Sequence, residues 1–172
     1  MKKIVLFVSA VLLSANAIFA QSEDDLKAQA LKDAQASGEA TMAWDVDGMM
    51  KFVHPNVFQL GGGVENIKQQ MQGLKDMMKT NGVSIDGYKV ENVKEFVKEQ
   101  GEFRCLVATT VNMSISGQKM KNASHLLGIY LEDKKHWSFI EASQLKGPLK
   151  AQIFPDFETK MTIPEDVMTP IE

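Results

Sequence analysis

The sequence is poor in cysteine and arginine. Cys105 is the only cysteine among 172 residues, so no disulfide can form within one chain and the fold depends on its core. Arg104 is the only arginine, and the lysines are scattered along the chain. Nucleic-acid binding and binding to anionic membranes both need a concentrated basic surface, so the composition argues against both partners.

Residue spacings typical of metal and phosphate sites are also missing. His54, His125 and His136 lie far apart, with no cysteine or second histidine at zinc-ligand spacing. The stretch 45–48 (Asp-Val-Asp-Gly) lacks the later oxygen ligands of a calcium loop, and capping of a helix explains it better. The three glycines 61–63 lack the Lys-Ser/Thr of a phosphate-binding loop. We therefore predict no metal and no cofactor.

What is present begins with an export signal. Lys2 and Lys3 precede an apolar run from Ile4 to Leu13, and small residues follow up to Ala20. This order is typical of a cleavable secretory signal, and the run is shorter than the ~20 apolar residues that span a bilayer. We expect cleavage after Ala20, and residues 15–17 (Ala-Asn-Ala) offer a competing small-x-small site. The shortness of the apolar run disfavours the alternative of a retained N-terminal anchor. The protein would then be exported, periplasmic or extracellular in a bacterium, with no membrane attachment.

The remaining sequence predicts one α+β domain over residues 21–143 and a proline-containing tail over 144–172. Helical patterns cover Asp24 to Ala43, a short stretch that Asp45 caps, and a segment between the glycines 61–63 and Asn81. A brief strand is expected at 57–60. The alternating pattern then predicts an antiparallel meander of four strands, at 85–98, 102–116, 119–131 and 136–142.

The longest of these strands predicts a sheet with one face toward the core. Phe103, Cys105 and Val107 share an apolar face, and the opposite face carries Glu102 and Arg104, which we expect to form a surface ion pair. Cys105 is expected to be a buried, inert thiol. The prolines of the tail exclude a continuous helix, so the tail either drapes over the domain or stays partly mobile.

Three segments resemble the nuclear-transport-factor-2-like superfamily (SnoaL-like, cystatin-like fold). Residues 44–57 combine an acid, a short apolar helix and Pro-Asn; glycines 61–63 open a helix; residues 134–140 form a last strand with an early Trp. The resemblance covers about residues 24–143. It implies N-terminal helices packed on a curved antiparallel sheet, a cone-shaped cavity and frequent homodimers. The superfamily includes both enzymes and binding domains, so the fold does not fix the function.

The preferred hypothesis is an exported, non-catalytic domain that binds a small apolar or amphipathic ligand, or a partner segment, in the cone-shaped pocket. The apolar stripes rich in methionine and aromatic residues favour such a pocket over a catalytic site. The residues predicted to line it are Trp44, Phe58, Met71, Tyr88, His125 and Trp137.

Two alternatives stay open. The first is a small isomerase, cyclase or dehydratase with His125 and Glu141 as proton carriers. Each has a simpler explanation: His125 as a hydrogen-bonded core residue, and Glu141 as a solvated group near a strand end. The second is a protein–protein interaction module that uses the convex face of the sheet and the tail. Deletion from Ser143 onward should then abolish partner capture and leave the fold intact.

Overall fold

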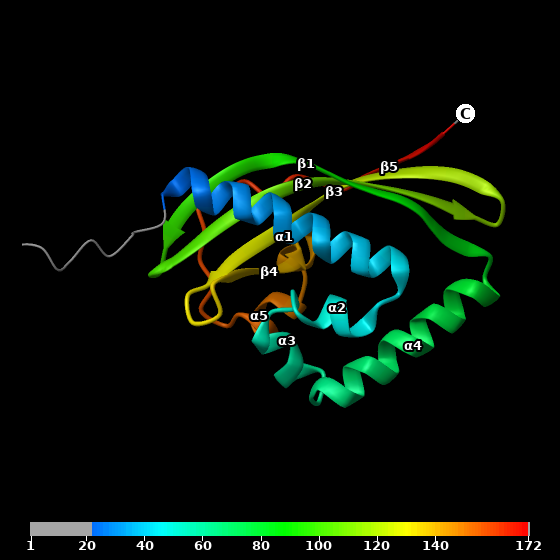
Figure 1. The fold of residues 1–172 in the computed structure, drawn as a ribbon, viewed down its shortest axis with the longest axis horizontal. Helices are drawn as coiled ribbons and strands as arrows, with labels where there is room; N and C mark the ends of the chain where they lie inside the picture. The colour runs from blue at the N-terminus through cyan, green and yellow to red at the C-terminus, as the bar shows by residue number, and fades with distance from the viewer. Residues whose placement is uncertain (1–21, 172) are drawn as a thin grey trace, which may run out of the picture.

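Helices come first along the chain and a five-stranded sheet follows, as the computed structural model of residues 22–171 shows (Figure 1). The α+β class predicted from the sequence is confirmed. The helices are α1 (Glu23–Ala43), α2 (Val46–Met50), α3 (Pro55–Leu60), α4 (Val64–Thr80), the 3-10 helix η1 (Ala142–Lys146) and α5 (Leu149–Ile153). The strands are β1 (Val83–Glu99), β2 (Glu102–Ile115), β3 (Gln118–Leu131), β4 (His136–Glu141) and β5 (Val167–Pro170).

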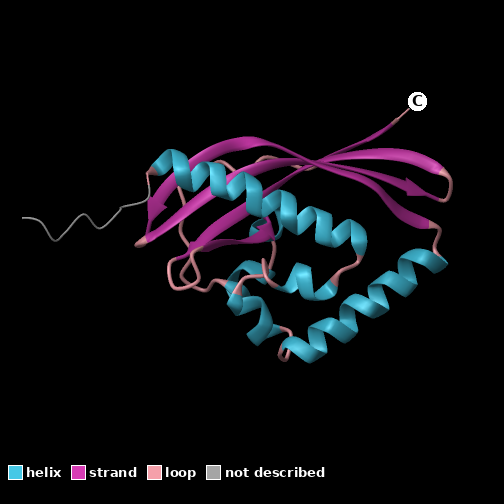
Figure 2. Cartoon of the chain, in the orientation of Figure 1, coloured by secondary structure: helices cyan, strands magenta, loops and turns pink. Residues whose placement is uncertain are grey.

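Helix α1 lies across one face of the sheet (Figure 2). A capping box starts it: the Ser22 hydroxyl accepts from the Asp25 amide at 3.1 Å, and the Asp25 carboxylate accepts from the Ser22 amide at 3.3 Å. Its buried stripe includes Ala30, Ala34 and Gly38. A Cβ atom at Gly38 would lie 2.0 Å from the ring of Tyr88, so this glycine lets the helix meet the sheet at close range.

The segment predicted as a strand at 57–60 is helical, so that prediction is wrong. Pro55 occupies the first turn of α3, where its missing amide hydrogen costs nothing. The imidazole of His54 caps the helix by accepting from the Asn56 amide at 3.2 Å. The upstream Asp45, by contrast, caps α2 as expected, since its carboxylate accepts from the Gly48 amide at 3.0 Å.

The four long strands form the predicted antiparallel meander, in the order β1-β2-β3-β4. The observed bounds agree with the predicted ones to within two residues. One edge of β3 is shared, because β4 pairs with residues 126–131 and β5 pairs with residues 120–123. The C-terminal segment thus returns to the sheet after leaving it at η1.

Both faces of the sheet are covered, so the prediction of a single core-facing side is wrong. On the α1 face, Cys105 and Val107 are fully buried against the helix. On the other face, Leu106, Leu127 and Ile140 pack against η1, α5 and residues 154–161. The tail therefore drapes over the domain and builds a second core there.

Arg104 shows how the tail is held. It was expected in a surface pair, yet it is 3% exposed because residues 154–158 cover it. Its guanidinium donates to the Glu158 carbonyl at 2.7 Å, to the Gln100 side chain at 2.7 Å and to the Glu102 carboxylate at 2.9 Å. It also stacks 4.3 Å from the ring of Phe157. This arginine joins β2 to the C-terminal segment.

Candidate functional site

A cavity of about 670 Å³ lies between α3, α4, η1 and α5. Its walls are mostly aliphatic. The apolar side chains that line it are Val57, Leu60, Ile67, Met71, Leu74, Leu149 and Ile153. Cavities of this size, with apolar walls and few polar groups, are typical of sites for small organic molecules.

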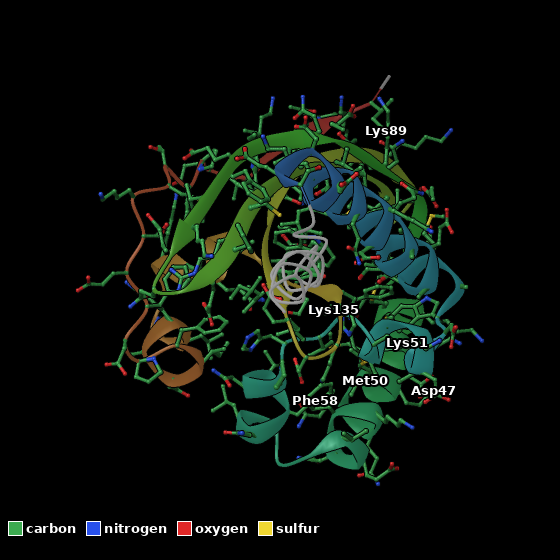
Figure 3. All side chains as sticks on the ribbon, turned by 60° about the vertical axis from the view of Figure 1, so that its left-hand side comes forward. Asp47, Met50, Lys51, Phe58, Lys89 and Lys135 are labelled. Carbon is green, nitrogen blue, oxygen red and sulfur yellow. The ribbon has the colours of Figure 1, made fainter. Side chains whose placement is uncertain are left out.

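One wall is the amphipathic helix α4, which runs from the end of α3 toward the start of β1 (Figure 1). Ile67 is the only buried residue of this helix, while Met71 is half-buried and Leu74 is 45% exposed. The helix is tied to α2 by Lys68, whose ammonium lies 2.7 Å from the Asp47 carboxylate beside α4 (Figure 3). Because few contacts hold α4, its apolar stripe is available to a ligand.

The opposite wall comes from the tail. Ile153 of α5 is fixed to the first turn of α3, since the Asn56 side chain donates to its carbonyl at 2.8 Å. The next residue, Phe154, packs edge-on against the buried His54 ring, with ring centroids 4.8 Å apart. Burial lowers the pKa of His54, so this imidazole is neutral at pH 7. The tail side chains that line the cavity on this side, Leu149 and Ile153, are both apolar.

The polar side chains of the cavity are all carboxamides: Asn66, Gln70 and Gln144. Asn66 is engaged, because its amide donates to the Gly61 carbonyl at 2.6 Å. Gln70 and Gln144 are exposed at the cavity. No charged side chain lines it among the residues that the structure describes.

The predicted pocket residues occupy several places. Met71 lines the cavity, and Phe58 lies on the adjoining α3 but does not line it (Figure 3). Trp44 follows α1 in a left-handed conformation (φ 52°), and the Lys75 ammonium of α4 lies 5.8 Å from its ring centre. Trp44 is thus a contact of α4, beside the cavity wall.

The other three predicted pocket residues lie in the sheet. Trp137 is fully buried, and its indole donates to the Leu26 carbonyl at 3.0 Å, so it belongs to the core under α1. Tyr88 packs on Gly38 of α1. His125 pairs with Ala108, whereas its neighbour Leu126 pairs with Glu141, so alternation puts His125 and Glu141 on opposite faces.

Glu141 belongs to a polar group on the α1 face of the sheet. The Ser124 hydroxyl donates to its carboxylate, and the Thr109 hydroxyl lies 3.1 Å from that of Ser124. Burial, followed by the nearby charge of Asp166, raises the pKa of Glu141 to about 7 despite the hydrogen bond. A carboxyl group with such a pKa is able to carry a proton near neutral pH.

Sequence reasoning missed most of the cavity. The apolar stripe of α4, with Ile67, Met71 and Leu74, is visible in the sequence as a helical period. Leu149 and Ile153 follow it by about eighty positions in a proline-containing segment with no clear period, and no local signal joins them to α4.

Comparisons of the chain with protein-family models, curated proteins and solved structures found no match. None of the helices within residues 22–171 is long and apolar enough to span a membrane. The same residues contain no group of three or more histidine, cysteine, aspartate or glutamate side chains that could hold a metal ion. The expected signal, residues 1–20, lies outside the described residues.

Proposed function

We propose that this protein binds a small amphipathic molecule in the cavity between α3, α4, η1 and α5. The observation that carries the proposal is an aliphatic cavity of about 670 Å³, within the range of about 300–1,000 Å³ typical of small-molecule sites. The resemblance to nuclear-transport-factor-2-like domains supports it, since many of them bind ligands without chemistry. The pattern of residues 1–20 supports a protein that acts after export.

The test fills the cavity. Met71→Trp puts a larger side chain into the space that the ligand would take, so it should weaken binding of the uncharged dye Nile red by about tenfold or more. Met42→Trp, on an exposed position of α1, is the matched control and should bind the dye like the parent protein. Fluorescence titration gives both affinities, and circular dichroism checks folding. Equal binding by both variants would remove the proposed site.

A second candidate, acid–base chemistry at Glu141, is favoured by its raised pKa and its bond to Ser124. His125 has no part in it, because it lies on the other face of the sheet. The test is loss of deuterium from the α-carbon of small enolisable ketones in the presence of the protein. Exchange that Glu141→Gln abolishes would support this function, and exchange equal to that of buffer would exclude it for those substrates.

A further inference from the structure

The charge character of the cavity points to the class of its ligand. Its aliphatic walls offer no ionised partner within the described residues, and its polar side chains are the three carboxamides. The lysines that neighbour the lining residues in sequence are engaged elsewhere. Lys68 pairs with Asp47 and Lys146 pairs with Glu165, while Lys75 and Lys150 lie 5.8 Å and 5.9 Å from the ring centres of Trp44 and Phe157.

An ionised head group would be poorly accommodated there. Where a carboxylate or ammonium group loses part of its hydration, it needs an opposite charge or several hydrogen bonds, and without them this loss opposes binding. An uncharged hydroxyl, ester or amide head needs one or two hydrogen bonds, which a carboxamide supplies as donor and as acceptor. The cavity walls therefore favour ligands with an uncharged head group over ligands with an ionised one.

Two of the carboxamides are free to make those bonds. Gln70 projects from α4 and Gln144 from η1, so they belong to different walls of the cavity. Within residues 22–171 neither side chain has a hydrogen-bond partner, whereas Asn66 is committed to the Gly61 carbonyl. A head group between the walls would be reached by amides from two elements that are distant in sequence.

We propose that the cavity selects an uncharged amphipathic molecule whose polar head is hydrogen-bonded by Gln70 and Gln144. This inference rests on the proposed binding function, and it adds the class of ligand and two residues that determine specificity. The aliphatic chain of the ligand lies along Ile67, Met71 and Leu74, and its head lies at the two amides.

The experiment compares three amphiphiles with the same lauryl chain: glyceryl monolaurate, laurate at pH 8.5 and lauryltrimethylammonium, each below its critical micelle concentration. Isothermal titration calorimetry on the full chain gives the affinities. We expect the affinity for glyceryl monolaurate to be higher than that for either ion by about tenfold or more. The double variant Gln70→Leu/Gln144→Leu should bind glyceryl monolaurate about tenfold less tightly than the parent protein. The control Gln69→Leu, at an exposed glutamine of α4 that does not line the cavity, should bind it like the parent protein.

Each outcome decides a different statement. Nile red binding together with equal or tighter binding of either ion overturns the selection of an uncharged head and leaves the binding function standing. A double variant that binds glyceryl monolaurate as tightly as the parent protein overturns the roles of the two glutamines. Nile red binding that Met71→Trp does not weaken overturns the site itself, and with it this inference.

Discussion

At the scale of single residues, Arg104 is the strongest polar constraint in the fold. Its guanidinium is 3% exposed and joins three acceptors from β2, the β1–β2 turn and the tail. Arg104→Lys keeps the charge but loses the fork of donors and leaves acceptors unpaired, so we expect a loss of about 3 kcal/mol in the free energy of unfolding. Urea denaturation measures it.

The control for this prediction is Lys89→Ala, which removes an exposed ion pair with Glu91 at 2.7 Å on the outer side of the sheet (Figure 3). The Lys89 side chain is 70% exposed, so the change should cost less than about 1 kcal/mol. A similar cost for both variants would mean that burial of Arg104 contributes nothing.

Glu141 gives the second residue-scale prediction. Its pKa is raised from 4.5 to about 7 in the folded protein, so folding favours its neutral form. The penalty is absent below pH 4.5, grows as the pH rises from 4.5 to 7, and is complete above 7, at no more than about 3 kcal/mol. Glu141→Gln should therefore stabilise the protein at pH 8 relative to its effect at pH 4, measured by urea denaturation.

The matched control is Glu132→Gln, which removes an exposed ion pair with Lys135 in the β3–β4 turn and should change stability by less than about 1 kcal/mol at either pH. Because each variant is compared with the parent protein at the same pH, the contribution of His54 to the pH dependence of stability cancels. Its lowered pKa acts in the opposite direction, because stability falls as the pH drops below 6.5 and this imidazole is forced to ionise. A Glu141→Gln effect independent of pH contradicts the raised pKa.

At the scale of elements, α4 is the least anchored long helix, since Ile67 is its only buried residue. Two glycines test this with the same substitution. Gly63 adopts φ 96° at the start of the helix, so Gly63→Ala is strained and should loosen α4. Gly73 lies inside the helix with open space around it, so Gly73→Ala should stabilise α4 by about 0.5–1 kcal/mol.

Amide hydrogen exchange read by mass spectrometry distinguishes these outcomes. In the parent protein α4 should exchange faster than α1, whose stripe is buried in the core. Gly63→Ala should accelerate exchange in α4 and Gly73→Ala should slow it, with little change in β2 and β3. Exchange of α4 at the same rate as α1 would show that the helix opens only with the whole domain.

Elements differ in how well the sequence predicted them. The four long strands were found because their alternation persists over many residues. The segment 57–60 is helical rather than a strand, because the cap at His54 and the proline after it outweigh the β preference of Val57 and Phe58. The polar pair at 102 and 104 suggested a solvated face, and only the return of the tail buries it.

At the scale of the whole molecule, the candidate site could be predicted only in part, because the tail also returns to form one side of the cavity. The helical stripe containing Met71 is local in sequence, but the cavity exists because α5 closes it from the other side. Packing between segments about eighty residues apart leaves no periodic signal in either of them. The tail is thus part of both the core and the cavity.

The tail gives the last prediction. A chain that ends at Ala142 loses the side chains that cover Leu106, Leu127 and Ile140, each of which contributes about 2 kcal/mol when buried. Such losses approach the total stability of a domain of this size, so this chain should not fold cooperatively, contrary to the expectation that it stays intact.

A chain that ends at Ile163 loses β5 but keeps the second core, and it should unfold cooperatively and still bind Nile red. Calorimetric scans and dye titration of both truncations test this. Cooperative unfolding of the shorter chain would show that the sheet and α1 are sufficient for folding without their second cover.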